Sequence, residues 1–332
     1  MASIHGILSA STIQAPPIVA ELEAIFREFP DEELLTKLRG PRRRGPKGYD
    51  PIILWRSYIA FYYLALPSVS DLIRCLHDNP WIAAACGIEG PIPSQPTFSR
   101  FFGKLATYEM RAYVSKVFHG LTRRLSDTLP DFGKSVAIDA TDLKAWSNGA
   151  KRPTSDKDAG WVVKGDTHGK KKYVWGYKLT LAVDTESELP MAFKLTKGNV
   201  ADVKVAAPVL NRIRNHVSPR FHPEYIIADA GYSSQELRTF IQRQYRAMPI
   251  IKAHPLHARA RKRYPETPEF RMAYSRRQSV ERVNARLKGH RRLNSIRVRG
   301  LMKVEMHCLL ALVTMQAQAL ATGCRASVRK VA

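Results

Sequence analysis

The chain has 332 residues, 45% of them hydrophobic and 9% aromatic, which excludes a disordered protein and leaves room for a sizeable core in one or two domains. Its formal net charge of +24 favours a polyanionic partner, most commonly nucleic acid, over a charge that serves only solubility. Four scattered cysteines without a Cys-x-x-Cys pair argue against a disulfide framework or a zinc site and favour a reducing cytoplasm.

The N-terminal part of the chain predicts a helical domain over residues 1–126. Residues 1–10 lack the basic region of a signal peptide, so we expect none. From Thr97 as an N-cap, one helix is expected over 98–125. The earlier predicted helices cover residues 20–38 with a break at Pro30, 52–66 and 71–78.

Two features of this domain suggest contact with DNA. Short helices and a tight turn before Thr97 favour a helix-turn-helix, in which Ser99, Arg100 and Lys104 would contact DNA, although any small helical bundle has a similar pattern. The basic loop 39–51 contains Gly and Pro that exclude regular structure. It is equally a solvated linker or a strap across DNA phosphates, formed by Arg42, Arg43 and Arg44.

A boundary at 127–134 opens a second predicted domain, 127–332, in which the apolar period changes. Residues 135–146 alternate as a strand with Asp139 on one face, and another buried strand ends at Asp229. The order of elements predicts a mixed α/β domain of the ribonuclease H-like class, in which these two acids come close. The other predicted elements are a long loop over 147–172, a hairpin of 173–184 with 189–196, helices over 202–217, 234–245, 274–288 and 300–321, and a strand over 247–253.

The predicted helix over 274–288 holds a lone acid in a basic row. On a continuous helix, Tyr274 and Lys288 return to within about 20° of Glu281, and Arg277 lies about 40° away. A separate apolar stripe suits packing on a sheet; it consists of Val280, Val283 and Leu287. Around this helix, residues 252–299 contain fifteen Lys and Arg against three Glu, a net charge of +12. The alternative for one such helix is a salt-bridged surface.

Three separated carboxylates, Asp139, Asp229 and Glu281, have the chemistry that phosphodiester cleavage and strand transfer require. Two Mg²⁺ ions about 4 Å apart activate an oxygen nucleophile and stabilise the leaving oxygen, and they prefer hard oxygen ligands. One strand Asp alone is more often structural than catalytic. Asp142 is the alternative to Asp139 but falls on the opposite strand face.

The sequence resembles the bacterial insertion-sequence transposases of the DDE type that carry a Tyr-Arg-Glu-Lys signature. The signature spacing of two, three and six intervening residues fits Tyr274, Arg277, Glu281 and Lys288. The segments IDATDLKAW and ADAGYSS resemble the first-Asp and second-Asp segments of the family. RGPRRRGPKGYDP through FSRFFGKL resembles its helical N-terminal domain, so the similarity covers nearly the whole chain.

The resemblance implies that Asp139, Asp229 and Glu281 bind two Mg²⁺ ions, replaceable by Mn²⁺, with Asp139 bridging them. Tyr274, Arg277 and Lys288 would contact phosphates at the transposon ends. The implied reaction is cleavage at the 3′ ends, followed by attack of the 3′-OH on target DNA. It also implies a homo-oligomer on paired terminal repeats, a cytoplasmic, nucleoid-associated location and no membrane. Only 52 residues separate Asp229 from Glu281, so a large β-rich insertion is absent and the route of second-strand cleavage is open.

Four aromatic or histidine side chains could also contact nucleic acid. Trp146, Trp161 and Trp175 could stack on a flipped base, although core or hairpin packing is favoured. His168 is a phosphate contact or a solvated loop residue. Three acids are assigned structural positions as turn, N-cap and helix-start residues: Asp184, Asp202 and Glu236. Two competing functions are a ribonuclease H-fold nuclease or resolvase, and a DNA-binding remnant that has lost its chemistry.

Overall fold

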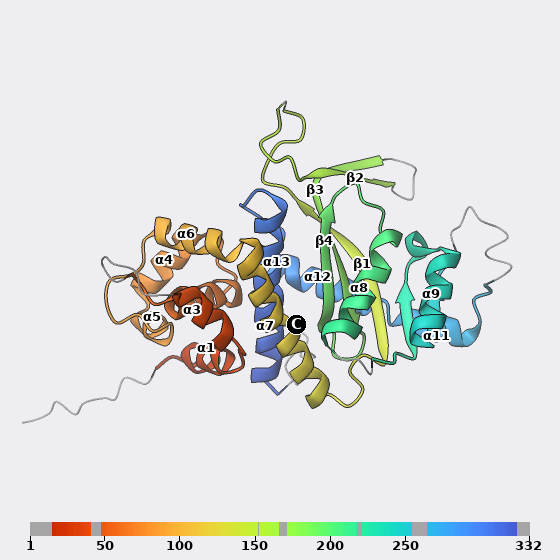
Figure 1. The fold of residues 1–332 in the computed structure, drawn as a ribbon, viewed down its shortest axis with the longest axis horizontal. Helices are drawn as coiled ribbons and strands as arrows, with labels where there is room; N and C mark the ends of the chain where they lie inside the picture. The colour runs from red at the N-terminus through yellow and green to blue at the C-terminus, as the bar shows by residue number, and fades with distance from the viewer. Residues whose placement is uncertain are drawn as a thin grey trace, which may run out of the picture.

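The computed structural model describes residues 15–40, 48–151, 153–165, 171–217, 221–253 and 264–323. Helices occupy its N-terminal part and a mixed sheet its C-terminal part, so the fold is mixed α/β (Figure 1). The N-terminal helices are α1 (Pro17–Arg27), α2 (Glu32–Arg39), α3 (Pro51–Tyr63), α4 (Val69–Asp78), α5 (Pro80–Ala85), α6 (Gln95–Leu105) and α7 (Tyr108–Thr128).

The predicted single helix over 98–125 is wrong, because the chain forms α6 and α7 with a break at Ala106–Thr107. The Thr107 side chain accepts a hydrogen bond from the backbone N–H of Met110, which is an N-cap inside the stretch. Thr97 is not the N-cap of α6, since that helix already begins at Gln95.

The sheet is built around β1 (Ser135–Lys144), which pairs antiparallel with β3 (Lys171–Asp184) and parallel with β5 (Tyr225–Ala228). On the far side of β3 lies β4 (Pro190–Lys197), and β6 (Met248–Ile251) continues the sheet in parallel beyond β5. The strand order is therefore β4, β3, β1, β5 and β6. The sequence predicted each of these five strands.

One strand was missed. The stretch 147–172, predicted as a long loop, contains β2 (Gly160–Gly165), which pairs antiparallel with the first half of β3 and extends the sheet as a projecting hairpin (Figure 1). Trp161 and Trp175 face each other across this pair with ring centroids 5.3 Å apart, which is the hairpin packing that the sequence favoured. The polar, turn-rich residues around β2 hid its short alternation.

The remaining helices cover the two faces of the sheet. One face carries α8 (Val203–His216) and α9 (Gln235–Tyr245), and the other faces α12 (Gln278–His290). The stripe of α12 is fully buried and packs on β1 and β3, which confirms its predicted role: Val280, Val283 and Leu287.

The predicted continuous helix over 274–288 is wrong. The chain forms α11 (Pro268–Ser275) and then α12, with Arg277 at the N-cap of the second helix. The backbone N–H groups of Arg277 and Ser279 bond three residues back, to Tyr274 and Arg276, which tightens the chain into turns between the helices. Residue propensity does not disfavour a continuous helix here, so we attribute the break to tertiary contacts of these side chains.

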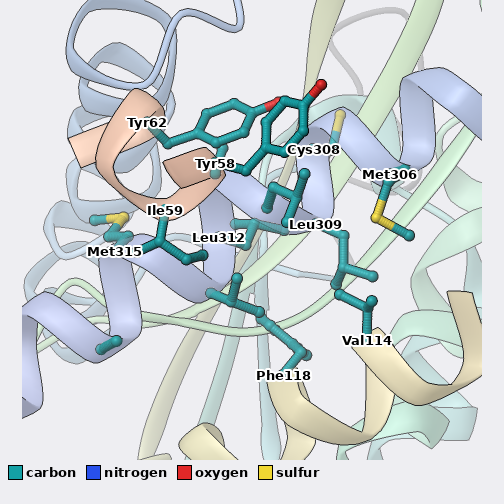
Figure 2. Close-up of a cluster of buried hydrophobic side chains, with 14 of the residues drawn as sticks. Tyr58, Ile59, Tyr62, Val114, Phe118, Met306, Cys308, Leu309, Leu312 and Met315 are labelled. Carbon is teal, nitrogen blue, oxygen red and sulfur yellow. The ribbon is translucent and has the colours of Figure 1, made fainter. Parts of the chain in front are cut away.

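The last helix, α13 (Leu301–Ala321), lies between the helical layer and the sheet (Figure 1). Length and composition alone would let it cross a membrane, but 78% of its apolar window is buried inside the protein. It is therefore the core helix that the sequence predicted. Figure 2 shows side chains of α3, α7 and α13 meeting in one apolar cluster, which includes Tyr62, Phe118 and Leu312.

Candidate active site

The pairing of β1 with β5 brings Asp139 and Asp229 side by side. The last register pair is Ile138 with Ala228, and the next residue on each strand is the aspartate. Asp229 keeps an extended backbone, with φ −78° and ψ −179°. Neighbouring strands lie about 4.8 Å apart, so the two Cα atoms are about 5 Å apart.

Side-chain alternation directs both aspartates to the face covered by α12. Ala137 and Ile227 belong to the core cluster that contains the apolar stripe of α12, whereas Ile138 and Ala228 belong to the cluster under α8 and α9. Two residues on from Ala137 and Ile227, the aspartates share their face. The 3-10 turn after β5 fixes Asp229, since its Oδ1 accepts a hydrogen bond of 2.9 Å from the Gly231 N–H.

Arg277 joins the third acid to this pair. Its Nη2 donates to Glu281 Oε1, and its Nη1 lies 3.9 Å from Asp139 Oδ2. Glu281 is half-exposed and Asp139 is 19% exposed, so the guanidinium stands between a partly buried carboxylate and a more solvent-facing one. Although burial opposes its charge, Tyr274, Glu281 and Asp139 hold the pKa of Arg277 above its usual value.

The aromatic ring of Tyr274, with a lysine over it, lies beside the acids. Its ring stacks on Phe270 with centroids 5.8 Å apart, and Lys252 Nζ lies 4.7 Å from the ring centroid. Burial raises the pKa of its phenol; Arg277 opposes that rise and Asp229 adds to it. Tyr274 therefore lies near both the second acid and Arg277, although it comes from α11 and not from the helix of Glu281.

A second layer lies behind the acids and was not found from the sequence. Tyr232 is 1% exposed, and its pKa is raised by burial and then by Asp139, Asp202 and Asp229. Lys178 Nζ donates to Asp202 Oδ1 at 2.9 Å and to the Val200 carbonyl at 3.1 Å. Asp202 occupies the predicted N-cap position of α8 but makes no capping bond, because its carboxylate pairs with Lys178.

The other structural acids are as predicted. Asp184 accepts from the Ser187 N–H in the β3–β4 turn at 2.7 Å, and Glu236 lies in the first turn of α9. Asp142 alternates with Asp139 and falls on the opposite face of β1, next to Lys178 in the register.

The remaining predicted DNA contacts have varied positions. Arg100 is exposed on α6, Lys288 is half-buried in the last turn of α12, and Lys104 Nζ donates to the Leu38 carbonyl at 2.6 Å. The basic strap of Arg42, Arg43 and Arg44 lies outside the described residues, as does His168.

The donor chemistry of the acids fits a hard divalent cation, since all three offer carboxylate oxygens and two come from adjacent strands. Within the described ranges, no three His, Cys, Asp or Glu side chains converge closely enough to hold an ion in this arrangement. Arg277 supplies the compensating positive charge between Asp139 and Glu281. Because Glu281 is half-exposed, a rotamer change suffices to release it from Arg277.

Comparison with known proteins gives two family matches. Residues 13–104 match a family described as "Transposase domain (DUF772)", and residues 131–315 match one described as "Transposase DDE domain". No curated protein matches the chain.

Two solved structures are matched at low similarity. A piggyBac transposase synaptic complex with hairpin DNA shares 10% identity over 94% of this chain and 77% of its own, with a TM-score of 0.44. A Mos1 transposase paired-end complex with the left transposon end shares 11% identity over 86% of this chain and 84% of its own, with a TM-score of 0.21. Since the second family match spans more than half of the chain, the protein belongs to the family of transposases with a DDE domain.

Proposed function

We propose that the chain is a DNA transposase that binds the ends of an insertion sequence and catalyses metal-dependent cleavage and strand transfer. The observation that carries the proposal is that the acids share one face of the sheet: Asp139 and Asp229 extend adjacent strands, and Arg277 links Glu281 to Asp139. The order β4, β3, β1, β5, β6, with β5 and β6 parallel to β1, supports a ribonuclease H-like catalytic domain behind a helical N-terminal domain.

In this proposal, Asp139, Asp229 and Glu281 hold two Mg²⁺ ions, or Mn²⁺ in their place. Such ions would activate an oxygen nucleophile and neutralise charge on the leaving oxygen. Without DNA, Arg277 balances the charge of the acids. With DNA bound, its guanidinium can instead bind a phosphate through two parallel hydrogen bonds. Tyr274 and Lys252 form the wall beside that phosphate, and Lys288 extends the cationic side of α12.

The spacing of Tyr274, Arg277, Glu281 and Lys288 supports membership of the group with the Tyr-Arg-Glu-Lys signature. The proposed partners are the terminal inverted repeats, the target DNA and further copies of this chain, in a bacterial cytoplasm. The net charge of +24 is consistent with a DNA partner.

A supercoiled plasmid tests the proposal directly. It would carry the DNA that flanks the coding region on both sides and would be incubated with the purified chain and Mg²⁺. Joined products support transposition. Ends that are cut but never joined indicate a nuclease or resolvase, and binding without cleavage indicates a remnant; either result contradicts the proposal.

A further inference from the structure

A basic cavity of about 340 Å³ lies at the junction of the helical layer and the segment that follows α12. We call it the junction cavity. Its walls come from α3, from the turn before α4, from α6 and from residues 292–303. Its volume lies within the range of cavities that bind small ligands.

The charge of the junction cavity is positive. Arg292, Arg297 and Lys303 line it, and no Asp or Glu is among the described residues that do. Asp71 lies outside the lining and pairs with Arg74 at 2.9 Å. Burial lowers the pKa of His307, at the base of the cavity, to about 4, so its ring is neutral at pH 7 and adds no charge.

Arg292 occupies an uncommon backbone conformation at this place. Its φ is +62°, and its Nε is buried without a hydrogen-bond partner among the described residues. Non-glycine residues in the left-handed region cluster at binding sites, where the surrounding structure fixes them. Arg292 therefore brings a guanidinium to the lining in a fixed position, and guanidinium groups are strong hydrogen-bond donors to phosphate oxygens.

The floor of the cavity is aromatic. Tyr58 and Phe102 are among the residues that line it, and Figure 2 shows Tyr58 and Tyr62 at one edge of the apolar cluster that fixes them. Ser99 and Gly103 of α6 form the opposite rim. Cations at the mouth and rings at the base match the two halves of a nucleotide, its phosphate and its sugar or base.

The cavity is also close to the proposed active site. Arg297 lies 5.9 Å from the ring centroid of Trp146, which is 54% exposed and follows β1 by two residues. Trp146 lies seven positions after Asp139, so the extended chain between them spans at most about 23 Å. One turn of duplex is about 34 Å long, so a single DNA end can reach both places.

We propose that the junction cavity binds one nucleoside phosphate unit of a DNA strand, at a site separate from the three carboxylates. This inference rests on the proposed function, since it takes DNA as the partner. The cations contact the phosphate, and the aromatic floor contacts the sugar or base. Because Arg292 lies two residues after the end of α12, DNA in the cavity also ties the N-terminal helices to the helix that carries Glu281.

Two kinds of variant separate the effect of the cavity's shape on DNA binding from the effect of its charge. In Gly103→Trp, the new ring enters the cavity without changing charge, and an added Cβ at Gly103 meets no atom within 4 Å. Gly103→Ala is its matched control. The Arg297→Ala/Lys303→Ala pair removes two exposed lining cations, and Arg299→Ala removes an exposed cation from the same segment outside the lining.

Fluorescence anisotropy would measure binding of labelled DNA from the region that flanks the coding sequence. We expect Gly103→Trp and the double variant each to weaken binding at least about tenfold, with the double variant lowering the slope of log affinity against log salt by about 1.5. Both controls should bind like the wild type. Circular dichroism checks folding; if Gly103→Trp is misfolded, the double variant and Arg299→Ala decide the outcome.

The contrary outcomes are distinct. Wild-type affinity in folded Gly103→Trp, or equal losses in the double variant and Arg299→Ala, would overturn the junction-cavity proposal and leave the proposed function standing. Calorimetric binding of free deoxyadenosine monophosphate that Gly103→Trp abolishes, with DNA affinity unchanged, would assign the cavity to a free nucleotide and also overturn it. A wild-type chain that does not prefer the flanking DNA would instead remove the proposed function.

Discussion

Glu281 is half-exposed and pairs with Arg277, four residues earlier in its own chain segment. Glu281→Gln keeps the shape and the hydrogen-bonding reach of the side chain but removes a hard anionic ligand. We expect DNA affinity within about twofold of the wild type and cleavage reduced by more than about 100-fold, a loss in the range that single catalytic groups cause. Cleavage of flanking-DNA plasmid measures the effect.

Glu236→Gln is a matched control for this prediction, because Glu236 is an exposed acid in the first turn of another helix. It should cleave like the wild type. Cleavage that persists in Glu281→Gln would show that the assignment of the third acid is wrong.

Arg277 carries the charge balance of the site, since it contacts Asp139 and Glu281 at once. Arg277→Ala removes the cation between Asp139 and Glu281 and, with it, the proposed phosphate contact. We expect weaker binding to the flanking DNA and a slope of log affinity against log salt smaller by about 0.9, with Lys288→Ala having the same direction. Anisotropy titrations over a salt series measure the slope. An unchanged slope in both variants would contradict the phosphate role.

At the scale of elements, Glu188 in the β3–β4 turn holds α12 against the sheet. Its carboxylate accepts from Arg282 and, at 2.8 Å, from Arg286 of α12, and the acid is only 18% exposed. In Glu188→Gln the charge of both pairs is lost. We expect the free energy of unfolding to fall by about 1–2 kcal/mol and cleavage to drop with it, because Glu281 lies on the helix so positioned.

Urea unfolding with cleavage assays would measure both effects. Glu186→Gln, an exposed acid in the same turn, should change neither. Equal stability of wild type and Glu188→Gln would show that apolar packing alone positions α12.

The sequence predicted elements well where apolar spacing was strong and poorly where a contact between distant residues decided the outcome. The stripe of α12 and the alternation around Asp139 depend on local period and were read correctly. The break between Tyr274 and Gln278 was not predicted, because the side chains on its two sides make different contacts. Tyr274 stacks on Phe270, whereas Arg277 lies beside Asp139. The Lys178–Asp202 pair also joins two elements and has no local signal.

At the scale of the whole molecule, His307 lies where α13 meets α3, and its Nδ1 is 2.5 Å from the Tyr62 hydroxyl. Burial lowers its pKa to about 4. The folded state therefore resists protonation of a group that the unfolded state protonates below about pH 6.5. Its effect is absent above that pH, and stability is lost as pH falls from about 6.5 towards 4.

His307→Gln removes this titration while keeping a polar partner for Tyr62. We expect the loss of unfolding free energy between pH 6.5 and 4 to be smaller in the variant, by at most about 3 kcal/mol. Urea unfolding at several pH values measures the difference. Parallel profiles of unfolding free energy against pH for both chains would show that protonation of His307 does not destabilise the fold.

The helix that completes the N-terminal layer comes from the other end of the chain. α13 runs beside α7, with Glu305 paired to Arg111 near one end and Gln316 Nε2 donating to Thr122 Oγ1 at 2.7 Å further on. Gln316 also donates to the Pro190 carbonyl of β4, so α13 joins both layers. The apolar residues of α1, α3, α7 and α13 form one continuous cluster. The boundary between 1–126 and 127–332 remains a prediction, but this shared core bears on what a fragment can do.

We expect the fragment 1–126 alone to unfold without a cooperative transition, because removing α13 exposes the apolar faces of α1, α3 and α7. α7 and α13 run in the same direction, so a linker from residue 126 to residue 300 must return along the helices by about 30 Å. Joining 1–126 to 300–323 through a flexible Gly/Ser linker of about 30 residues, which spans about that distance, should restore cooperativity. Thermal circular dichroism compares the two chains. A sharp transition in 1–126 alone, at the temperature of the full chain, would show that the helical layer folds without its last helix.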